Sequence, residues 1–154
     1  MGTEDIRNMI WDYTRRIKDG TNKAFTPLCE KHGLTMMQGR IITELHHSGP
    51  KSIGNLADGI SVAGANLSAM CKKMEDQGFV KRNRDSTDER KVQVELTERG
   101  LQIAQDIDSM LLFKLQKVLE TQNELTLDEI IKGMVLLTDL LDQISEVKVK
   151  QLED

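Results

Sequence analysis

The sequence predicts a mainly α-helical fold that carries one small β-hairpin. Most apolar residues recur at spacings of three and four, which is the period of a helix with one buried face. In a single stretch, Val92, Val94 and Leu96 alternate with polar residues, which is the period of a half-buried strand. The chain has 154 residues, of which 38% are hydrophobic, so we expect one domain over residues 1–154.

The helical pattern divides into segments on both sides of the hairpin. Thr35 to Gln38 has the pattern of a capping box, in which the Gln38 side chain bonds back to the Thr35 backbone, and it starts the second helix. A second capping box, Thr126 to Glu129, starts the last helix. Gly78 stands where a helix commonly ends in a left-handed residue. The helices are therefore expected at about residues 6–28, 35–47, 53–60, 65–77, 97–121 and 126–144.

The third and fourth helices meet at a short turn and are followed at once by a basic hairpin at residues 79–96. This order is that of a winged helix-turn-helix, in which the second helix of the pair enters the major groove of DNA and the hairpin, or wing, lies beside it. The exposed face of that helix carries short polar groups suited to base edges and lysines suited to phosphates. The candidate DNA-binding residues are Asn66, Ser68, Lys72 and Lys73 on the helix and Arg82, Arg84, Arg90 and Lys91 on the wing.

The charge distribution along the chain is uneven. The net charge is -4, which by itself opposes a nucleic-acid partner, because affinity for phosphate is mostly electrostatic. Residues 51–91 nevertheless contain eight Lys or Arg and six Asp or Glu, whereas residues 92–154 contain six and thirteen. Positive charge therefore gathers on the helix pair and the wing. Charge alone would favour a hairpin whose arginines are only solvated. The adjoining helix pair instead favours contact of these arginines with DNA.

The stretch from Leu34 to Gly100 also carries a set of residues at characteristic spacings. They are Leu34, Thr35, Gln38, Leu45, Leu56, Ala57, Leu67, Ser68, Met74, Glu75, Gly78, Phe79, Val80, Asp88, Arg90, Leu96, Thr97 and Gly100. This set resembles the MarR family of bacterial regulators, named for multiple antibiotic resistance. The resemblance implies a DNA-binding region at about residues 34–100, with the fourth helix in the major groove, Arg90 near the minor groove and Asp88 holding the wing. Ala63 departs from the family, in which a serine often starts the fourth helix, so a side-chain cap and an early base contact are missing.

Helices outside that region are expected to form a dimer. The last helix carries a narrow apolar seam that needs a partner helix, formed by Ile130, Met134, Leu137, Leu141 and Ile144. We therefore expect a dimerisation region at residues 1–32 and 101–150, and a homodimer that presents two reader helices to a palindromic operator. The family resemblance further implies a repressor that releases DNA when a small aromatic or phenolic effector binds between the dimer and reader regions.

Other classes of function compete with this one. Cys29 and Cys71 make no C-x-x-C pattern and are expected to pack in the core; the alternative is a thiol-based redox-sensing regulator, with Cys29 the better candidate. A second alternative is a winged-helix module that binds another protein. No catalytic constellation or metal-ligand set is recognised, so we expect no enzyme, no cofactor and no metal. The short apolar runs and the polar N-terminus predict a cytoplasmic protein with no membrane partner.

Overall fold

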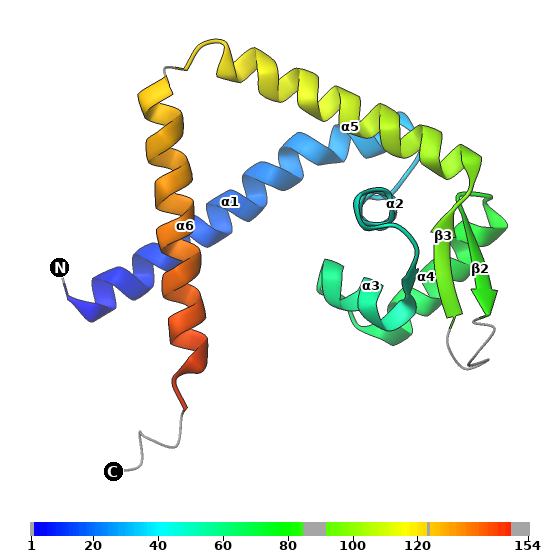
Figure 1. Ribbon diagram of the computed structural model, residues 1–154, viewed down its shortest axis with the longest axis horizontal. Helices are drawn as coiled ribbons and strands as arrows, with labels where there is room; N and C mark the ends of the chain where they lie inside the picture. Colours follow the sequence, from blue (N-terminus) through cyan, green and yellow to red (C-terminus); the bar gives the residue numbers. More distant parts are fainter. Residues whose placement is uncertain (1, 85–91, 123, 149–154) are drawn as a thin grey trace. The chain divides into compact units, whose positions relative to one another are not determined.

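The structure is a computed structural model that describes residues 2–84, 92–122 and 124–148 (Figure 1). The elements in chain order are α1 (Thr3–Lys31), α2 (Met36–Ser48), β1 (Lys51–Ser52), α3 (Ile53–Ile60), α4 (Gly64–Asp76), β2 (Val80–Arg84), β3 (Val92–Leu96), α5 (Glu98–Leu119) and α6 (Glu124–Glu146). The chain divides into two compact units, Met1–Phe113 and Lys114–Asp154, and α5 crosses from one to the other. None of the described helices is long and apolar enough to span a membrane.

The first unit contains a winged helix-turn-helix, which confirms the predicted fold class. α3 and α4 are joined by a turn in which Ser61 takes a left-handed φ of 55°. β2 and β3 form the predicted antiparallel hairpin, with Val80 opposite Leu96. β1 adds a third strand, with Lys51 opposite Val94, so the antiparallel sheet has the order β1-β3-β2. The sequence pattern did not indicate β1, because two residues are too few to show an alternation.

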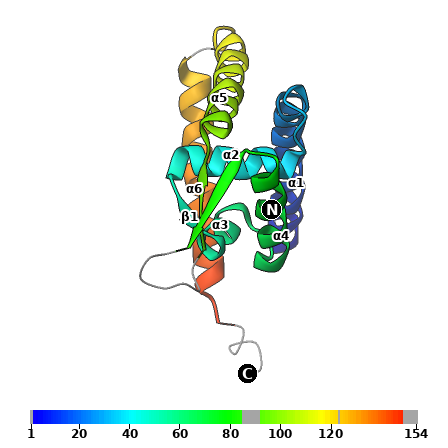
Figure 2. The same cartoon turned by 90° about the vertical axis from the view of Figure 1, so that its right-hand side faces the viewer.

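The hydrophobic core of this unit is built around α2. This helix is seen end-on in Figure 1 and lengthwise in Figure 2, and it packs against α1, α3 and β3. α4 packs against α3 and β2, and the first half of α5 contributes further buried residues. The largest fully buried side chains are Cys29, Ile41, Ile42, Leu56, Leu67, Cys71, Met74, Val80, Val94 and Ile107.

Two of the predicted helix ends are confirmed and one is wrong. The Gln38 N–H donates to Thr35 Oγ1 at 3.3 Å and the Thr35 N–H donates to Gln38 Oε1 at 2.9 Å, which completes the capping box of α2. Gly78 follows α4 with the expected left-handed φ, at 75°. α6, however, begins at Glu124, so Thr126 lies inside the helix and does not cap it. Glutamate and leucine are strong helix formers, and they extend the first turn back by two residues.

Candidate nucleic-acid interface

α4 has one buried face and one exposed face. Leu67, Cys71 and Met74 are fully buried against the core. Since successive residues of a helix are turned by about 100°, the opposite face is centred on Ala65 and Ala69, both of which are exposed. These small side chains leave the helix backbone close to any partner that covers this face.

The predicted binding residues of α4 surround these alanines. Asn66, Lys72 and Lys73 are exposed. Within the part of the chain that the structure describes, neither lysine forms an ion pair. Ser68 is partly buried and lies at the edge of the exposed face. The structure thus brings one amide and two ammonium groups together around a surface of small side chains.

α4 begins without a side-chain cap, as Ala63 predicts. Ala63 has an extended backbone with φ -62° and ψ 130°, and no side-chain hydrogen bond caps the helix there. The first N–H groups of a helix have no partner within it, so those of Gly64 and Ala65 are directed out of the helix start. Together with the positive end of the helix dipole, they favour an anion such as a phosphate.

β2 directs alternate side chains to opposite sides of the hairpin. Lys81 and Asn83 are exposed, and both bind Glu95 on β3. Lys81 Nζ lies 3.1 Å from Glu95 Oε1, and Asn83 Nδ2 donates to the same oxygen at 2.6 Å. The hydrogen bond from Lys81, and then that from Asn83, lower the pKa of Glu95. The outer side of the hairpin base is therefore a paired, charged surface.

Arg82 points toward α4 rather than away from the molecule. Its backbone N–H donates to Glu75 Oε1 at 2.9 Å, and its Nη1 lies 3.8 Å from Glu75 Oε2. The Arg82 side chain is only 21% exposed, and its Nε has no hydrogen-bond partner among the described residues. A DNA contact by Arg82 would thus require its guanidinium to leave Glu75. The other predicted wing groups, the side chain of Arg84 and all of Asp88, Arg90 and Lys91, lie outside the described residues.

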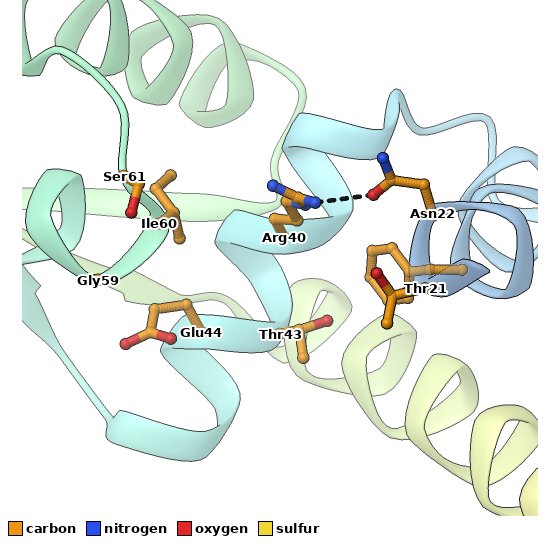
Figure 3. Close-up of a pocket in the computed structure, with 9 residues that line it drawn as sticks. Thr21, Asn22, Arg40, Thr43, Glu44, Gly59, Ile60 and Ser61 are labelled. Atoms are coloured by element: carbon orange, nitrogen blue, oxygen red, sulfur yellow. Dashed lines mark hydrogen bonds between the residues drawn. The ribbon is translucent and has the colours of Figure 1, made fainter. Parts of the chain in front are cut away.

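A pocket of about 440 Å³ opens between α1, α2 and the turn after α3 (Figure 3). Arg40 Nη2 donates to Asn22 Oδ1 at 2.8 Å across one side of it. Thr43 Oγ1 is buried and has no hydrogen-bond partner in the described part of the chain. Sequence reasoning missed this pocket, because its residues come from three elements and share no motif. The lining residues are Thr21, Asn22, Phe25, Arg40, Thr43, Glu44, Gly59, Ile60 and Ser61.

Glu44 ties this pocket to the helix-turn-helix. Its Oε1 lies 2.6 Å from Lys51 Nζ on β1 and accepts from the Ser48 hydroxyl at 3.1 Å. The hydrogen bond from Lys51 lowers the pKa of Glu44 against the opposing effect of burial. A Cβ built on Gly59 of α3 would lie 2.9 Å from the same carboxylate oxygen. One side chain of α2 therefore touches both β1 and α3.

Both cysteines are buried in the core. Burial, as the larger cause, raises the pKa of Cys29 and that of Cys71 to about 11. A Cβ on Gly39 would overlap Cys29 Sγ, which shows how closely α1 approaches α2 at this point. A thiol that is both inaccessible and neutral is a poor nucleophile, so the structure favours packing over thiol sensing for these residues.

We expect both thiols of the native protein to react slowly with Ellman's reagent at pH 8. With a pKa of about 11, roughly one thiol in a thousand is ionised at that pH. Because the pKa of each thiol is higher in the folded than in the unfolded protein, the folded state keeps its thiols protonated where the unfolded state would ionise them. The free energy of unfolding should therefore fall as the pH rises from the unfolded pKa of about 8.5 through the folded pKa. The reaction is followed by absorbance, with the protein in urea as the control in which both thiols react. A fast native thiol at pH 8 would contradict the assignment.

The fold, with the exposed face of α4 beside the β2–β3 hairpin, is that of a winged helix-turn-helix protein. Residues 23–107 match the family described as transcriptional regulator SarA/Rot. The chain belongs to this family of transcriptional regulators. The HTH-type transcriptional regulator SarZ from Staphylococcus haemolyticus is 32% identical over 81 residues, which are 53% of this chain and 55% of that protein. The chain therefore spans about half the length of the curated relatives that it matches.

Solved structures of MarR family regulators share the fold that the family resemblance implies. A MarR family protein from Bacillus stearothermophilus is 20% identical and has a TM-score of 0.73, over 95% of this chain and 100% of that one. Reduced AbfR bound to DNA has a TM-score of 0.70 at 20% identity, over 95% and 100% of the two chains. NadR in complex with 4-hydroxyphenylacetate has a TM-score of 0.68 at 22% identity, over 96% of each chain.

Proposed function

We propose that this chain is a homodimeric regulator of transcription that binds double-stranded DNA through α4 and the β2–β3 hairpin. The observation that carries the proposal is the exposed face of α4, where Asn66, Lys72 and Lys73 surround two alanines on a helix whose other face is anchored in the core. Its family of transcriptional regulators and its likeness in fold to DNA-bound AbfR support the proposal. The proposed function includes no catalytic step and no cofactor. A protein that binds bacterial DNA would be located in the cytoplasm.

The shape of α4 suits the major groove, which is about 12 Å wide and admits one helix. Ala65 and Ala69 let the backbone approach the base edges, and alanine can contact a thymine methyl group. Asn66 is suited to adenine, whereas Lys72 and Lys73 are suited to phosphates. In this proposal the wing lies beside the helix, with phosphate or minor-groove contacts by Arg84, Arg90 and Lys91 and with Asp88 supporting the wing.

Replacing Lys72 and Lys73 together with alanine should weaken DNA binding and reduce its dependence on salt. Each phosphate contact contributes about 0.9 to the slope of log K against log salt. The dimer presents two copies of each lysine, so the slope should fall by roughly 3.6 if all of them contact phosphates. Binding is measured by fluorescence anisotropy on a duplex of about 30 base pairs, long enough for two half-sites, selected from a random pool.

The matched control is Lys23→Ala, an exposed lysine of α1, which should keep the wild-type slope. An unchanged slope in the double variant would contradict the role of α4. A wild-type protein that selects no duplex at any salt concentration would favour the protein-binding module instead.

The dimer in this proposal rests on apolar side chains that each unit leaves exposed. In the unit Met1–Phe113, Trp11 is 72% exposed and Phe113 is 61% exposed. In the other unit, the predicted seam of α6 is open, and its Met134 is 62% exposed. Large apolar side chains that are exposed along a helix are typical of protein interfaces. A second copy of the chain carries the same seams and can bury them about a two-fold axis, which would match a palindromic operator.

The double variant Met134→Glu with Leu141→Glu should be monomeric, because it places charges in the seam. Light scattering after size exclusion at micromolar concentration measures the mass of each form. Lys132→Glu is the control, since it also adds a negative charge to α6 but lies on the opposite side of the helix. A monomeric wild-type protein, or a double variant that stays dimeric, would refute the proposed interface.

We further propose that the pocket beside Arg40 binds a small aromatic or phenolic anion that releases the repressor from DNA. Arg40 has more donors than the one directed at Asn22, and the Thr43 hydroxyl is buried without a partner among the described residues, so both can bind a carboxylate or phenolate. Phe25 and Ile60 offer an apolar wall for a ring. NadR, whose fold is similar, was solved with such a ligand. Glu44 joins the pocket to β1 and to α3. A ligand in the pocket would therefore disturb the helix-turn-helix that binds DNA.

We expect 4-hydroxyphenylacetate, used as the first probe of this class, to lower the anisotropy of the DNA complex and to raise the Tm of the free protein. Arg40→Met keeps the apolar bulk but removes the charged donors, and it should raise the effective concentration of the probe at least about tenfold. Arg7→Met, at an exposed position near the start of α1, is the control. A wild-type response in Arg40→Met would exclude this pocket, and no response of the wild type to a panel of phenolic acids would exclude the class of effector.

A further inference from the structure

The turn that ends α4 has a defined geometry. The Gly78 N–H donates to Glu75 O at 2.9 Å, and the Phe79 N–H donates to Met74 O at 2.9 Å. These two bonds are those of a Schellman motif, and the side chains of Met74 and Phe79 are both buried, as the apolar contact of that motif requires. This turn therefore fixes the direction of α4 relative to β2, the strand that follows it.

The first turn of α5 holds this turn from one side. Thr97 Oγ1 donates to Gly78 O at 2.7 Å. Arg99 Nη1 donates to Gln77 O at 3.0 Å, and the Arg99 guanidinium lies 4.7 Å from the centre of the Phe79 ring. These contacts fix the backbone at the end of α4, although they leave the Gln77 side chain to another partner.

That partner is Gln38, the first-turn residue of α2. Gln38 is 5% exposed and is the one buried polar residue among those whose burial the structure describes. Its Oε1 accepts from the Thr35 N–H at 2.9 Å, and its Nε2 donates to Gln77 Oε1 at 2.8 Å. Because a backbone N–H can only donate, the amide oxygen must face Thr35 and the amide nitrogen must face Gln77. Gln38 thus joins the start of α2 to the end of α4 in one orientation.

We propose that Gln38 is a positioning residue for DNA recognition, which sets the direction of α4 through its hydrogen bond to Gln77. This inference rests on the proposed function. Since Gln38 is buried, it acts without touching DNA. A change at Gln38 would instead move the exposed residues at the N-terminal end of α4. Asn66 is the polar side chain nearest that end.

The geometry of a helix amplifies a small change at the Gln77 end. From Gln77 to Asn66 the helix rises about 16 Å, at roughly 1.5 Å per residue. A tilt of about 10° at the turn would displace Asn66 by roughly 3 Å, which is more than a hydrogen bond to a base edge tolerates. Loss of the Gln77 acceptor would also leave a buried donor of Gln38 unpaired, and this favours a rearrangement of the contact.

The test uses the full chain and a duplex selected by the wild-type protein from a random pool. Gln77→Met removes the acceptor and keeps the length of the side chain, whereas Gln77→Glu supplies a carboxylate oxygen in its place. Gln77→Met should raise the Kd about tenfold and lower the salt slope, and Gln77→Glu should stay within about threefold of the wild type. Gln105→Met, at an exposed position of α5, is the matched control and should bind like the wild type.

Gln38→Met removes the donor from the other side and should reproduce the effect of Gln77→Met. Two further measurements separate positioning from stability. All affinities are measured well below the Tm of each variant, and hydrogen exchange of the α4 amides should be faster in Gln77→Met than in Gln77→Glu.

If both methionine variants bind with the Kd and salt slope of Gln105→Met, the positioning role is overturned while the proposed function stands, even if their Tm is lower. If the wild-type protein selects no duplex, the proposed function fails, and the positioning role fails with it. Loss of affinity in both methionine variants, restored in Gln77→Glu, supports the inference.

Discussion

The structure depends on one constraint: α4 must bury one face in the core and leave the other free for a partner. Leu67, Cys71 and Met74 satisfy the first requirement. Side-chain hydrogen bonds join the C-terminal end of the helix to α2, β2 and α5. At this end α5 approaches so closely that a Cβ on Gly100 would overlap Phe79 O. The uncapped N-terminal end and the alanine face stay open, as insertion of a helix into a groove requires. The hydrogen bonds at the C-terminal end of α4 thus leave the exposed residues at its N-terminal end accessible.

A reader of DNA needs local cations rather than a basic chain. Residues 1–113 contain 16 Lys or Arg and 16 Asp or Glu, and residues 114–154 contain 5 and 9, so the whole net charge of -4 belongs to the second unit. In the first unit, Lys51 and Lys81 are paired with glutamates, and Arg82 faces Glu75. Lys72 and Lys73 have no such partner among the described residues. For contact with phosphates, which cations are left without an ion pair therefore matters more than the net charge of the chain.

Much of the fold could be predicted because its patterns are local. The capping box at Thr35 and the left-handed Gly78 each lie within a few residues of the helix end that they define. The alternation in β3 likewise marks which side chains face inward. Arg82 shows the limit: the alternation along β2 places it on the side of buried Val80, yet its positive charge suggested an outward contact with DNA. Composition and periodicity disagreed there: periodicity places Arg82 inward, and the structure adds that Glu75 supplies the opposite charge on that side.

The sequence by itself determined the order of the helices, the hairpin and the class of fold, since periodicity records which face of each element is buried. Only the tertiary structure decided what each face is buried against. Gln38 and Gln77 are 39 residues apart, and Arg99 and Gln77 are 22 apart, so no local pattern links them. The pocket around Arg40 likewise draws on three elements. Such contacts depend on the angles at which elements pack, and those angles follow from the whole core rather than from any one segment.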